Sequence, residues 1–166
     1  SNELLKLCCI EGIHLAPTKK LSGFKGKRFA YLNGPEPGLE RNLLIMLHGF
    51  GGRKEPFADL AKSLQLPKTA VLALDGLEEL PEGLVSDDPV PAFSWHSMFD
   101  DDFNLLEGKA GDLRRLESLQ RTTLELANLL KSLEIELGWG AKEVFFLGYG
   151  QGGTAMLDAF CEWVGM

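Results

Sequence analysis

Residues 145–154 read FFLGYGQGGT, and this stretch carries the clearest structural signal in the chain. An apolar run leads into a glycine-rich turn, Gly148 to Gly153, and an amphipathic pattern, GTAMLDAFCEWV, follows it. Glycine permits sharp bends, and the first N–H groups of a helix are unpaired and carry the positive end of its dipole. The stretch therefore predicts a strand that bends tightly into a helix, with free backbone N–H groups at the bend.

A second glycine turn, LHGFGG at Leu47 to Gly52, directly follows the unbroken apolar run NLLIML. Such a run, bounded by turn signals, is typical of a strand buried on both faces. Parallel sheets bind ligands at the carboxyl ends of their strands. Because both glycine turns lie at such ends, we expect them to converge on one crevice.

Short apolar runs alternate with helical patterns along the whole chain. The predicted strands are Lys27 to Leu32, NLLIML, TAVLALDG and EVFFLG. Between two of them EPFADLAKSL places Phe57, Leu60, Ala61 and Leu64 on one helical stripe. This alternation predicts an α/β fold, a mostly parallel sheet with helices on both faces.

Two longer segments separate these runs. Residues 75–110 are rich in Asp, Pro and Gly, and an irregular stretch of that length inside a compact domain is usually functional. The next helix shows leucines at a spacing of three and four residues, and Gly138 follows as a stop signal. These leucines are Leu116, Leu119, Leu126, Leu130, Leu133 and Leu137. The stripe fits a coiled-coil seam or a helix lying on a sheet, and its short length and flanking strands favour the sheet.

Taken together, the two turns occur in the order, and at the separation of roughly 100 residues, that is typical of an α/β-hydrolase. The sequence resembles the phospholipase/carboxylesterase family, which includes the acyl-protein thioesterases. The pieces that carry the resemblance are LHGFGG, SWHSMFD and GYGQGG, and it covers roughly residues 41 to 164. The middle piece departs from the family's W-F-D pattern because it carries extra residues. The resemblance implies the N-terminal portion of an α/β-hydrolase fold and a small acyl ester or thioester as the ligand.

Carried over to this chain, the resemblance assigns the two oxyanion-hole donors to the backbone N–H groups of Phe50 and Gln151. It assigns the turn glycines to Gly49, Gly51, Gly148 and Gly152. It places Gly150 at the position of the family's nucleophilic serine, and glycine has no oxygen with which to attack an acyl group. We therefore expect this chain to be catalytically disabled.

The remaining residues offer no replacement for the missing serine or its partners. In this fold the acid and the histidine of the triad follow the serine, yet the only acidic residues after Gly153 are Asp158 and Glu162, and no histidine lies there. His14, His48 and His96 all precede the turn, and we expect His48 to order its loop. We interpret Cys161 as a packed core thiol, and Ser94 and Ser97 as residues of a polar loop without a base.

Three functions stay open at this stage. The chain is a disabled or incomplete esterase or thioesterase, a non-catalytic descendant that binds an acyl ligand or a partner, or a structural subunit of a larger assembly. In the family, further strands follow the turn helix, so EVFFLG is expected to form an open sheet edge here. An apolar open edge invites association, and we expect a continuation of the chain beyond this sequence, a second copy or a partner subunit to cover it.

Composition limits the number of domains, the classes of partner and the cellular compartment that we expect. The chain has 166 residues, 45% of them hydrophobic, which fits a single domain over residues 1–166, incomplete by comparison with the family. The net charge of −7 argues against nucleic acid as a partner. No apolar run approaches the roughly 20 residues of a membrane span, and Cys8, Cys9 and Cys161 lack the spacing of disulfide or metal sites. We expect a cytoplasmic protein without a metal or other cofactor.

Overall fold

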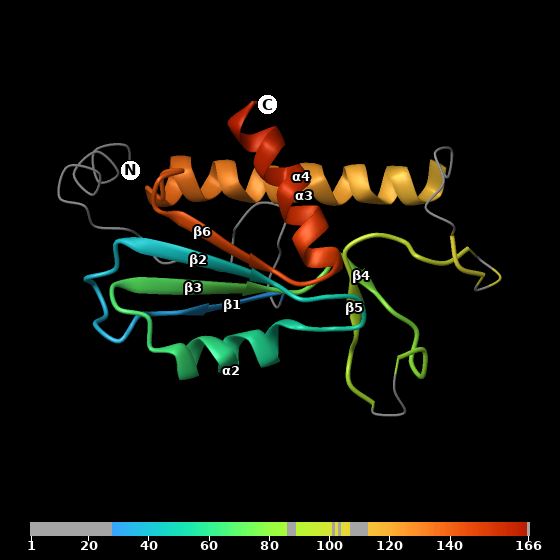
Figure 1. Ribbon diagram of the computed structural model, residues 1–166, viewed down its shortest axis with the longest axis horizontal. Coiled ribbons are helices and arrows are strands. Elements are labelled where there is room, and N and C mark those ends of the chain that lie inside the picture. The colour runs from blue at the N-terminus through green and yellow to red at the C-terminus, as the bar shows by residue number, and fades with distance from the viewer. Residues whose placement is uncertain (1–27, 86–88, 101, 103, 107–112, 166) are drawn as a thin grey trace.

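The computed structural model describes residues 28–85, 89–100, 102, 104–106 and 113–165. Its main sheet contains β1 (Phe29–Leu32), β2 (Asn42–Leu47), β3 (Thr69–Leu74) and β6 (Val144–Gly148), in the order β1-β3-β2-β6 (Figure 1). Strand β2 runs parallel to both β3 and β6, and β1 is antiparallel to β3. The predicted mostly parallel sheet is confirmed.

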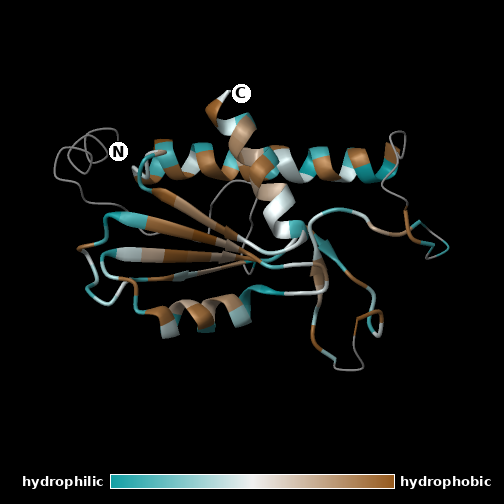
Figure 2. Cartoon of the chain, in the orientation of Figure 1, coloured by the Kyte–Doolittle hydropathy of each residue, from teal (hydrophilic) through white to brown (hydrophobic). Residues whose placement is uncertain are grey.

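Helices cover both faces of this sheet, as predicted. Helix α2 (Lys54–Leu64) lies on one face, and α3 (Leu113–Leu137) and α4 (Gln151–Val164) lie on the other (Figure 1). Alternate side chains of β2 point to opposite faces of the sheet. Leu43, Ile45 and Leu47 pack toward α3 and α4, whereas Leu44 and Met46 pack toward α2. The apolar run of β2 is therefore buried on both sides. In Figure 2 this strand is hydrophobic along its length after a hydrophilic first residue.

The start of α2 is held by the neighbouring strand. Arg53 precedes the helix and provides no side-chain cap. Asp75, directly after β3, accepts a hydrogen bond from the backbone N–H of Lys54 at 2.7 Å and pairs with its ammonium group at 2.6 Å. Asp75 is only 2% exposed, and these two contacts supply the partners that a buried carboxylate requires.

The predicted stripe on α2 is wrong in part. Ala58 and Ala61 are the buried residues, and Phe57 packs partly against them, but Leu60 and Leu64 are each 44% exposed. The two alanines allow α2 to approach the sheet closely, so the larger leucines beside them remain at the solvent boundary. A spacing rule based on hydrophobicity alone favours the larger leucines and does not predict that the alanines form the buried face.

The predicted stripe on α3 is correct only in its second half. Leu126, Leu130 and Leu133 are fully buried and join the core with the sheet, which confirms a helix packed on a sheet. In the first half Leu116 is 50% exposed, and the polar Ser118 and Thr122 are buried instead. This half lies beside the loop at 95–97 and not over the sheet, so its inner face carries hydrogen-bonding groups.

Two further expectations concern the segments around the core. Within the irregular region after Leu74, the structure places a short antiparallel pair, β4 (Glu78–Glu79) and β5 (Phe93–Ser94). Among the described strands, β6 pairs with β2 alone and lies at the edge of the sheet, where the sequence placed it. No helix in the described part of the chain is long and apolar enough to cross a membrane.

Candidate active site: two glycine turns

The two glycine turns meet at the carboxyl ends of β2 and β6. The N–H of Tyr149 donates a hydrogen bond to the carbonyl of Leu47 at 3.0 Å. A Cβ built at Gly152 would lie 2.5 Å from the carbonyl oxygen of His48, so a side chain there would collide with the first turn. The expected convergence of the turns is therefore confirmed, and it requires glycine at position 152.

The chain bends sharply at Gly150, between the end of β6 and the start of α4. Gly150 has φ 52° and ψ −121°, a combination that residues with a Cβ rarely adopt. The nearest atom to a Cβ built at Gly150 is the Cα of Gly49, at an ordinary contact distance of 3.7 Å. The backbone conformation, and not a lack of space, is what favours glycine at this position.

Several backbone N–H groups at this junction make no hydrogen bond to another described residue, and those of Phe50 and Gln151 are among them. Phe50 lies in the first turn, and its ring packs near Phe99 at 5.8 Å between centroids. Gln151 is the first residue of α4, where the helix dipole adds a partial positive charge. Both groups are chemically suited to hold an anionic or carbonyl oxygen. Their assignment as a shared oxyanion hole stays a prediction.

The other glycines of the predicted site occupy the same two turns. Gly49 and Gly51 lie in the first turn, where the N–H of Gly51 donates to the carbonyl of Phe93 at 2.9 Å. Gly148 ends β6, and a Cβ built there would lie 2.5 Å from the Cα of Gly153. This contact brings the last residue of the strand against the first turn of the helix.

His48 is a structural residue of the first turn. It is 1% exposed, its Nε2 accepts a hydrogen bond from the N–H of Gly76 at 3.0 Å, and its Nδ1 lies 2.6 Å from the carbonyl of Gly49. An Nε2 that accepts must be unprotonated, so Nδ1 carries the proton and donates it to that carbonyl. Burial lowers the pKa of His48 and keeps the ring neutral. With both nitrogens engaged by the backbone, His48 orders the loop as expected.

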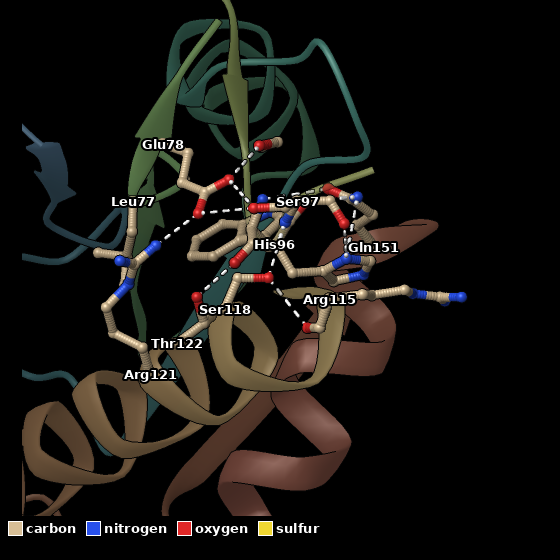
Figure 3. Close-up of polar contacts among 12 residues, drawn as sticks. Leu77, Glu78, His96, Ser97, Arg115, Ser118, Arg121, Thr122 and Gln151 are labelled. Carbon is tan, nitrogen blue, oxygen red and sulfur yellow. Dashed lines mark hydrogen bonds and ion pairs between the residues drawn. The ribbon is translucent and has the colours of Figure 1, made fainter. Parts of the chain in front are cut away.

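The loop that contains Trp95 forms hydrogen bonds to both glycine turns, and Trp95 itself is fully buried. The indole Nε1 of Trp95 donates to the carbonyl of His48 at 2.7 Å. The side chain of Gln151 accepts from the N–H of Trp95 and donates to the carbonyl of His96, each at 3.1 Å (Figure 3). The hydroxyl of Thr122 on α3 donates to the carbonyl of Trp95. Residues 95–96 thus link the first turn, the start of α4 and helix α3.

The two serines of this loop bond to a carboxylate that sequence reasoning did not identify. Both oxygens of Glu78 lie 3.2 Å from the hydroxyl of Ser97, and one lies 3.4 Å from that of Ser94 (Figure 3). The same carboxylate forms an ion pair with Arg121 of α3. Because this one carboxylate is shared between two serine hydroxyls and an arginine, the geometry supports a structural role for both serines.

The other candidates from the sequence do not form a catalytic group around Gly150. His96 is 3% exposed, burial lowers its pKa, and its Nδ1 lies 3.4 Å from the side-chain nitrogen of Gln151. Cys161 is exposed, so its interpretation as a core thiol is wrong. It falls on the outer face of α4, because the buried face of that helix is Ala155, Met156 and Ala159. His14, Cys8 and Cys9 lie outside the described residues.

A cavity of about 310 Å³ adjoins the first turn. Gly51, Gly52 and Arg53 form one wall, and residues of the segment 79–92 form the other. That second wall combines apolar side chains with two carboxylates, Glu79 and Glu82; its apolar residues include Leu80, Pro81, Val85, Val90 and Pro91. The volume falls at the lower end of the range for small-molecule sites.

Sequence reasoning missed the residues that hold the site together, chiefly Trp95, Glu78 and Thr122. The only signal for Trp95 was its place in the mid-chain segment SWHSMFD, which gave no partner for it. Glu78 and Thr122 lie in a loop and on a helix whose patterns showed no specific chemistry. Their roles depend on contacts with residues 16 to 43 positions away.

Comparisons with known proteins agree with this geometry. The model of the phospholipase/carboxylesterase family matches residues 36–162. An uncharacterized hydrolase of Mycosarcoma maydis is 31% identical over 153 residues, which span 90% of this chain and 52% of the relative. An uncharacterized hydrolase of Schizosaccharomyces pombe is 29% identical over 70% of this chain and 44% of its own. The chain thus spans about half the length of the curated relatives that it matches.

Solved structures share the fold at low sequence identity. The crystal structure of esterase PE8 aligns with a TM-score of 0.58 and 21% identity, over 80% of this chain and 56% of that one. Acyl-protein thioesterase 2 of Zea mays aligns with a TM-score of 0.53 and 19% identity, over 80% and 50%. The converging glycine turns, the parallel sheet and the family match together lead to one conclusion: this chain belongs to the phospholipase/carboxylesterase family of α/β-hydrolases.

Proposed function

We propose that this chain is a catalytically disabled member of its family, which holds the carbonyl or carboxylate group of a small acyl ester, thioester or related ligand without hydrolysing it. The observation that carries the proposal is the residue at the bend between β6 and α4. Gly150 occupies this bend and has no oxygen to form an acyl intermediate. In a serine hydrolase, removal of the nucleophile alone lowers turnover about a millionfold.

The residues around the bend support the loss of turnover. His48 directs both ring nitrogens to backbone groups, and His96 is buried beside Gln151. Neither histidine is arranged as a base for a nucleophile at position 150. The described part of the chain offers no other histidine.

The same residues support a retained binding site. The N–H groups of Phe50 and Gln151 have no acceptor among the described residues, and α4 adds its dipole beside Gln151. The cavity beside Gly51 gives room for a short acyl chain. Backbone donors do not depend on side-chain chemistry, so the loss of a serine hydroxyl leaves them in place.

Hydrolysis is tested with p-nitrophenyl butyrate, using the purified chain and the Gly150→Ser variant against a buffer blank. We expect no turnover above the blank for either protein, because the variant regains a hydroxyl but no base. Turnover by the unmodified chain contradicts the proposal. Turnover by the variant alone shows that a base is present, and it would assign the loss of activity to position 150 alone.

Binding is tested by titrating butyrate into ¹⁵N-labelled protein and recording amide chemical shifts. The N–H signals of Phe50 and Gln151 are expected to move, because both should donate to the carboxylate. The N–H of Gln120, within the exposed face of α3, serves as the control and should stay unchanged. Unchanged signals at Phe50 and Gln151 throughout the titration contradict retained binding.

A further inference from the structure

The ring of His48 fastens the first glycine turn through both of its nitrogens. Its Nε2 accepts a hydrogen bond from the backbone N–H of Gly76 at 3.0 Å, and its Nδ1 donates to the carbonyl of Gly49 at 2.6 Å. Only a neutral ring has one nitrogen that accepts and one that donates. After protonation, Nε2 carries a hydrogen that points at the N–H of Gly76, so two buried donors face each other without an acceptor.

The ring is enclosed by the turn that it holds. A Cβ built at Gly52 would lie 2.9 Å from both Cβ and Nδ1 of His48, and the ring of Trp95 lies 5.3 Å away between centroids. His48 itself is 1% exposed. A protonated ring therefore reaches water only when the turn opens.

The segment on the other side of the Nε2 hydrogen bond is held more firmly than the turn. The carbonyl of Gly76 accepts a hydrogen bond from the guanidinium of Arg28 at 2.9 Å, and a Cβ built at Gly76 would collide with the carbonyl oxygen of Ser94. The preceding residue, Asp75, is buried and bonds to both nitrogens of Lys54. Residues 50–52 of the turn are only partly buried, so the turn is the side that moves.

The charged groups around the ring come from several elements. Asp75 follows β3, Lys54 and Glu55 begin α2, and Arg28 reaches the neighbouring segment from the start of β1. The two carboxylates favour a protonated ring and Lys54 opposes it, but burial is the largest influence and lowers the pKa of His48. Both carboxylates are already paired with Lys54, at 2.6 Å and 2.9 Å. The ring is therefore neutral at neutral pH.

The same turn carries the N–H of Phe50, one of the two predicted donors to the ligand. The carbonyl of Gly49 accepts from Nδ1 of His48 and also from the N–H of Gly52, at 3.1 Å, which closes the turn around Phe50. A change at His48 acts on this shared carbonyl as well as on the bond to Gly76. The direction of the Phe50 N–H therefore depends on the ring.

We propose that the neutral ring of His48 positions the N–H of Phe50, and that protonation of this ring opens the first turn, so that the acyl ligand is released at acidic pH. The effect on binding rests on the proposed function, whereas the opening of the turn requires no ligand. His48 is a positioning residue, because it acts on the ligand only through the backbone of the turn. A ligand that requires the closed turn binds the neutral form, and protonation opposes it.

The first test follows the turn without a ligand, by amide hydrogen exchange and by NMR titration of the His48 ring from about pH 7.5 to about pH 5. The protection of the N–H groups of Gly52 and Gly76, corrected for intrinsic exchange, should fall roughly tenfold or more as the ring takes up its proton. The N–H of Leu72, within β3, is the control and should stay protected. Unchanged protection at Gly52 and Gly76 overturns the proposal, and so does a ring that stays neutral until the whole chain unfolds.

The second test replaces the titrating ring by a neutral acceptor. His48→Gln offers an amide oxygen to the N–H of Gly76 and has no proton to gain, so the protection of Gly52 and Gly76 should no longer depend on the pH. The matched control is His96→Gln, which removes the other buried ring and should leave the pH-dependent loss in place. A loss that disappears in His96→Gln, or persists in His48→Gln, overturns the proposal. If His48→Gln does not fold, the exchange of the unmodified chain decides.

The third test measures the dissociation constant of butyrate over the same pH range, where its carboxylate stays mostly ionised because carboxyl groups titrate at about pH 4–5. The constant should rise as the pH falls, by up to about tenfold per pH unit below the folded pKa of His48. It should stay constant in His48→Gln. Simple attraction between a protonated ring and a carboxylate would lower the constant instead, so the sign of the change is decisive.

The outcomes separate this inference from the proposed function. A dissociation constant that is unchanged or falls while the turn opens overturns the link between His48 and the ligand. If butyrate binds at no pH, the proposed function and the effect on binding are both overturned, and hydrogen exchange alone then decides whether His48 holds the turn closed.

Discussion

The side-chain oxygen of Gln151 accepts a hydrogen bond from the backbone N–H of Trp95 at 3.1 Å, which joins residues 56 positions apart in the chain. The amide nitrogen of the same side chain donates to the carbonyl of His96 at 3.1 Å. Gln151 is 8% exposed, so both partners lack water as an alternative. One side chain therefore satisfies two buried backbone groups of a loop, and it does so from the residue whose own N–H is a predicted oxyanion donor.

Gln151→Ala is expected to lower the free energy of unfolding by about 1–3 kcal/mol, because it leaves the N–H of Trp95 and the carbonyl of His96 buried without partners. Urea denaturation followed by tryptophan fluorescence measures the change. Gln120→Ala, at an exposed position of α3, is the matched control and should change stability by less than about 0.5 kcal/mol. Equal losses in the two variants would show that the contacts of Gln151 contribute nothing specific.

Gly150→Ala is expected to lower the melting temperature, because alanine must adopt φ 52° and ψ −121° at the bend. Strain of this kind costs about 1–3 kcal/mol. A steric clash does not cause the expected loss of stability, since the nearest atom to the new methyl group would be 3.7 Å away. Scanning calorimetry measures the shift.

Gly140→Ala is the control for Gly150→Ala. The backbone at Gly140 is outside the positive-φ region, and a Cβ there would meet only the end of the flexible Glu143 side chain at 3.5 Å. We expect its melting temperature to stay the same or rise slightly, because alanine restricts the unfolded chain. A rise for Gly150→Ala as well would contradict a strained bend at position 150.

Stability is expected to fall as the pH decreases below about 6.5, the ordinary pKa of histidine. Burial lowers the pKa of His48 in the folded state, although nearby Asp75 and Glu55 oppose this and Lys54 adds to it. The unfolded chain therefore takes up a proton first, and stability that is present at neutral pH is lost as the pH falls toward the folded pKa. Burial also lowers the pKa of His96, so this histidine changes the stability with pH in the same direction.

The measurement is the free energy of unfolding in urea at several values from about pH 7.5 to about pH 5.5, where each histidine contributes up to about 1.4 kcal/mol per pH unit. His48→Asn should be less stable throughout and should show a shallower dependence on pH. His96→Asn separates the second contribution. A free energy that is constant or rises toward pH 5.5 in the unmodified protein would show that neither ring is held neutral.

Much of the fold follows from local sequence patterns. The run NLLIML predicts a strand buried on both faces, and the structure places β2 at those same residues with Leu43 and Leu44 packed on opposite sides. The leucine pattern from Leu116 to Leu137 also predicted a helix and its end correctly, since Gly138 has φ 81° and the N–H of Trp139 bonds back to Leu133. Errors arose where a pattern was used to choose the buried face. Leu60 and Leu116 are exposed because their helices approach the core with small or polar residues.

The sequence by itself determined the mostly parallel sheet, the two sharp turns and the glycine at the bend, because each of these depends on residues adjacent in the chain. Apolar runs favour buried strands wherever they occur, and a glycine permits φ 52° without help from distant residues. Only the tertiary structure decided that Gln151 bonds to Trp95, that Glu78 bonds to both Ser97 and Arg121, and that Cys161 is exposed. These roles depend on which side chains the folded chain brings within hydrogen-bonding distance, and no local pattern encodes the separation of two residues far apart in sequence.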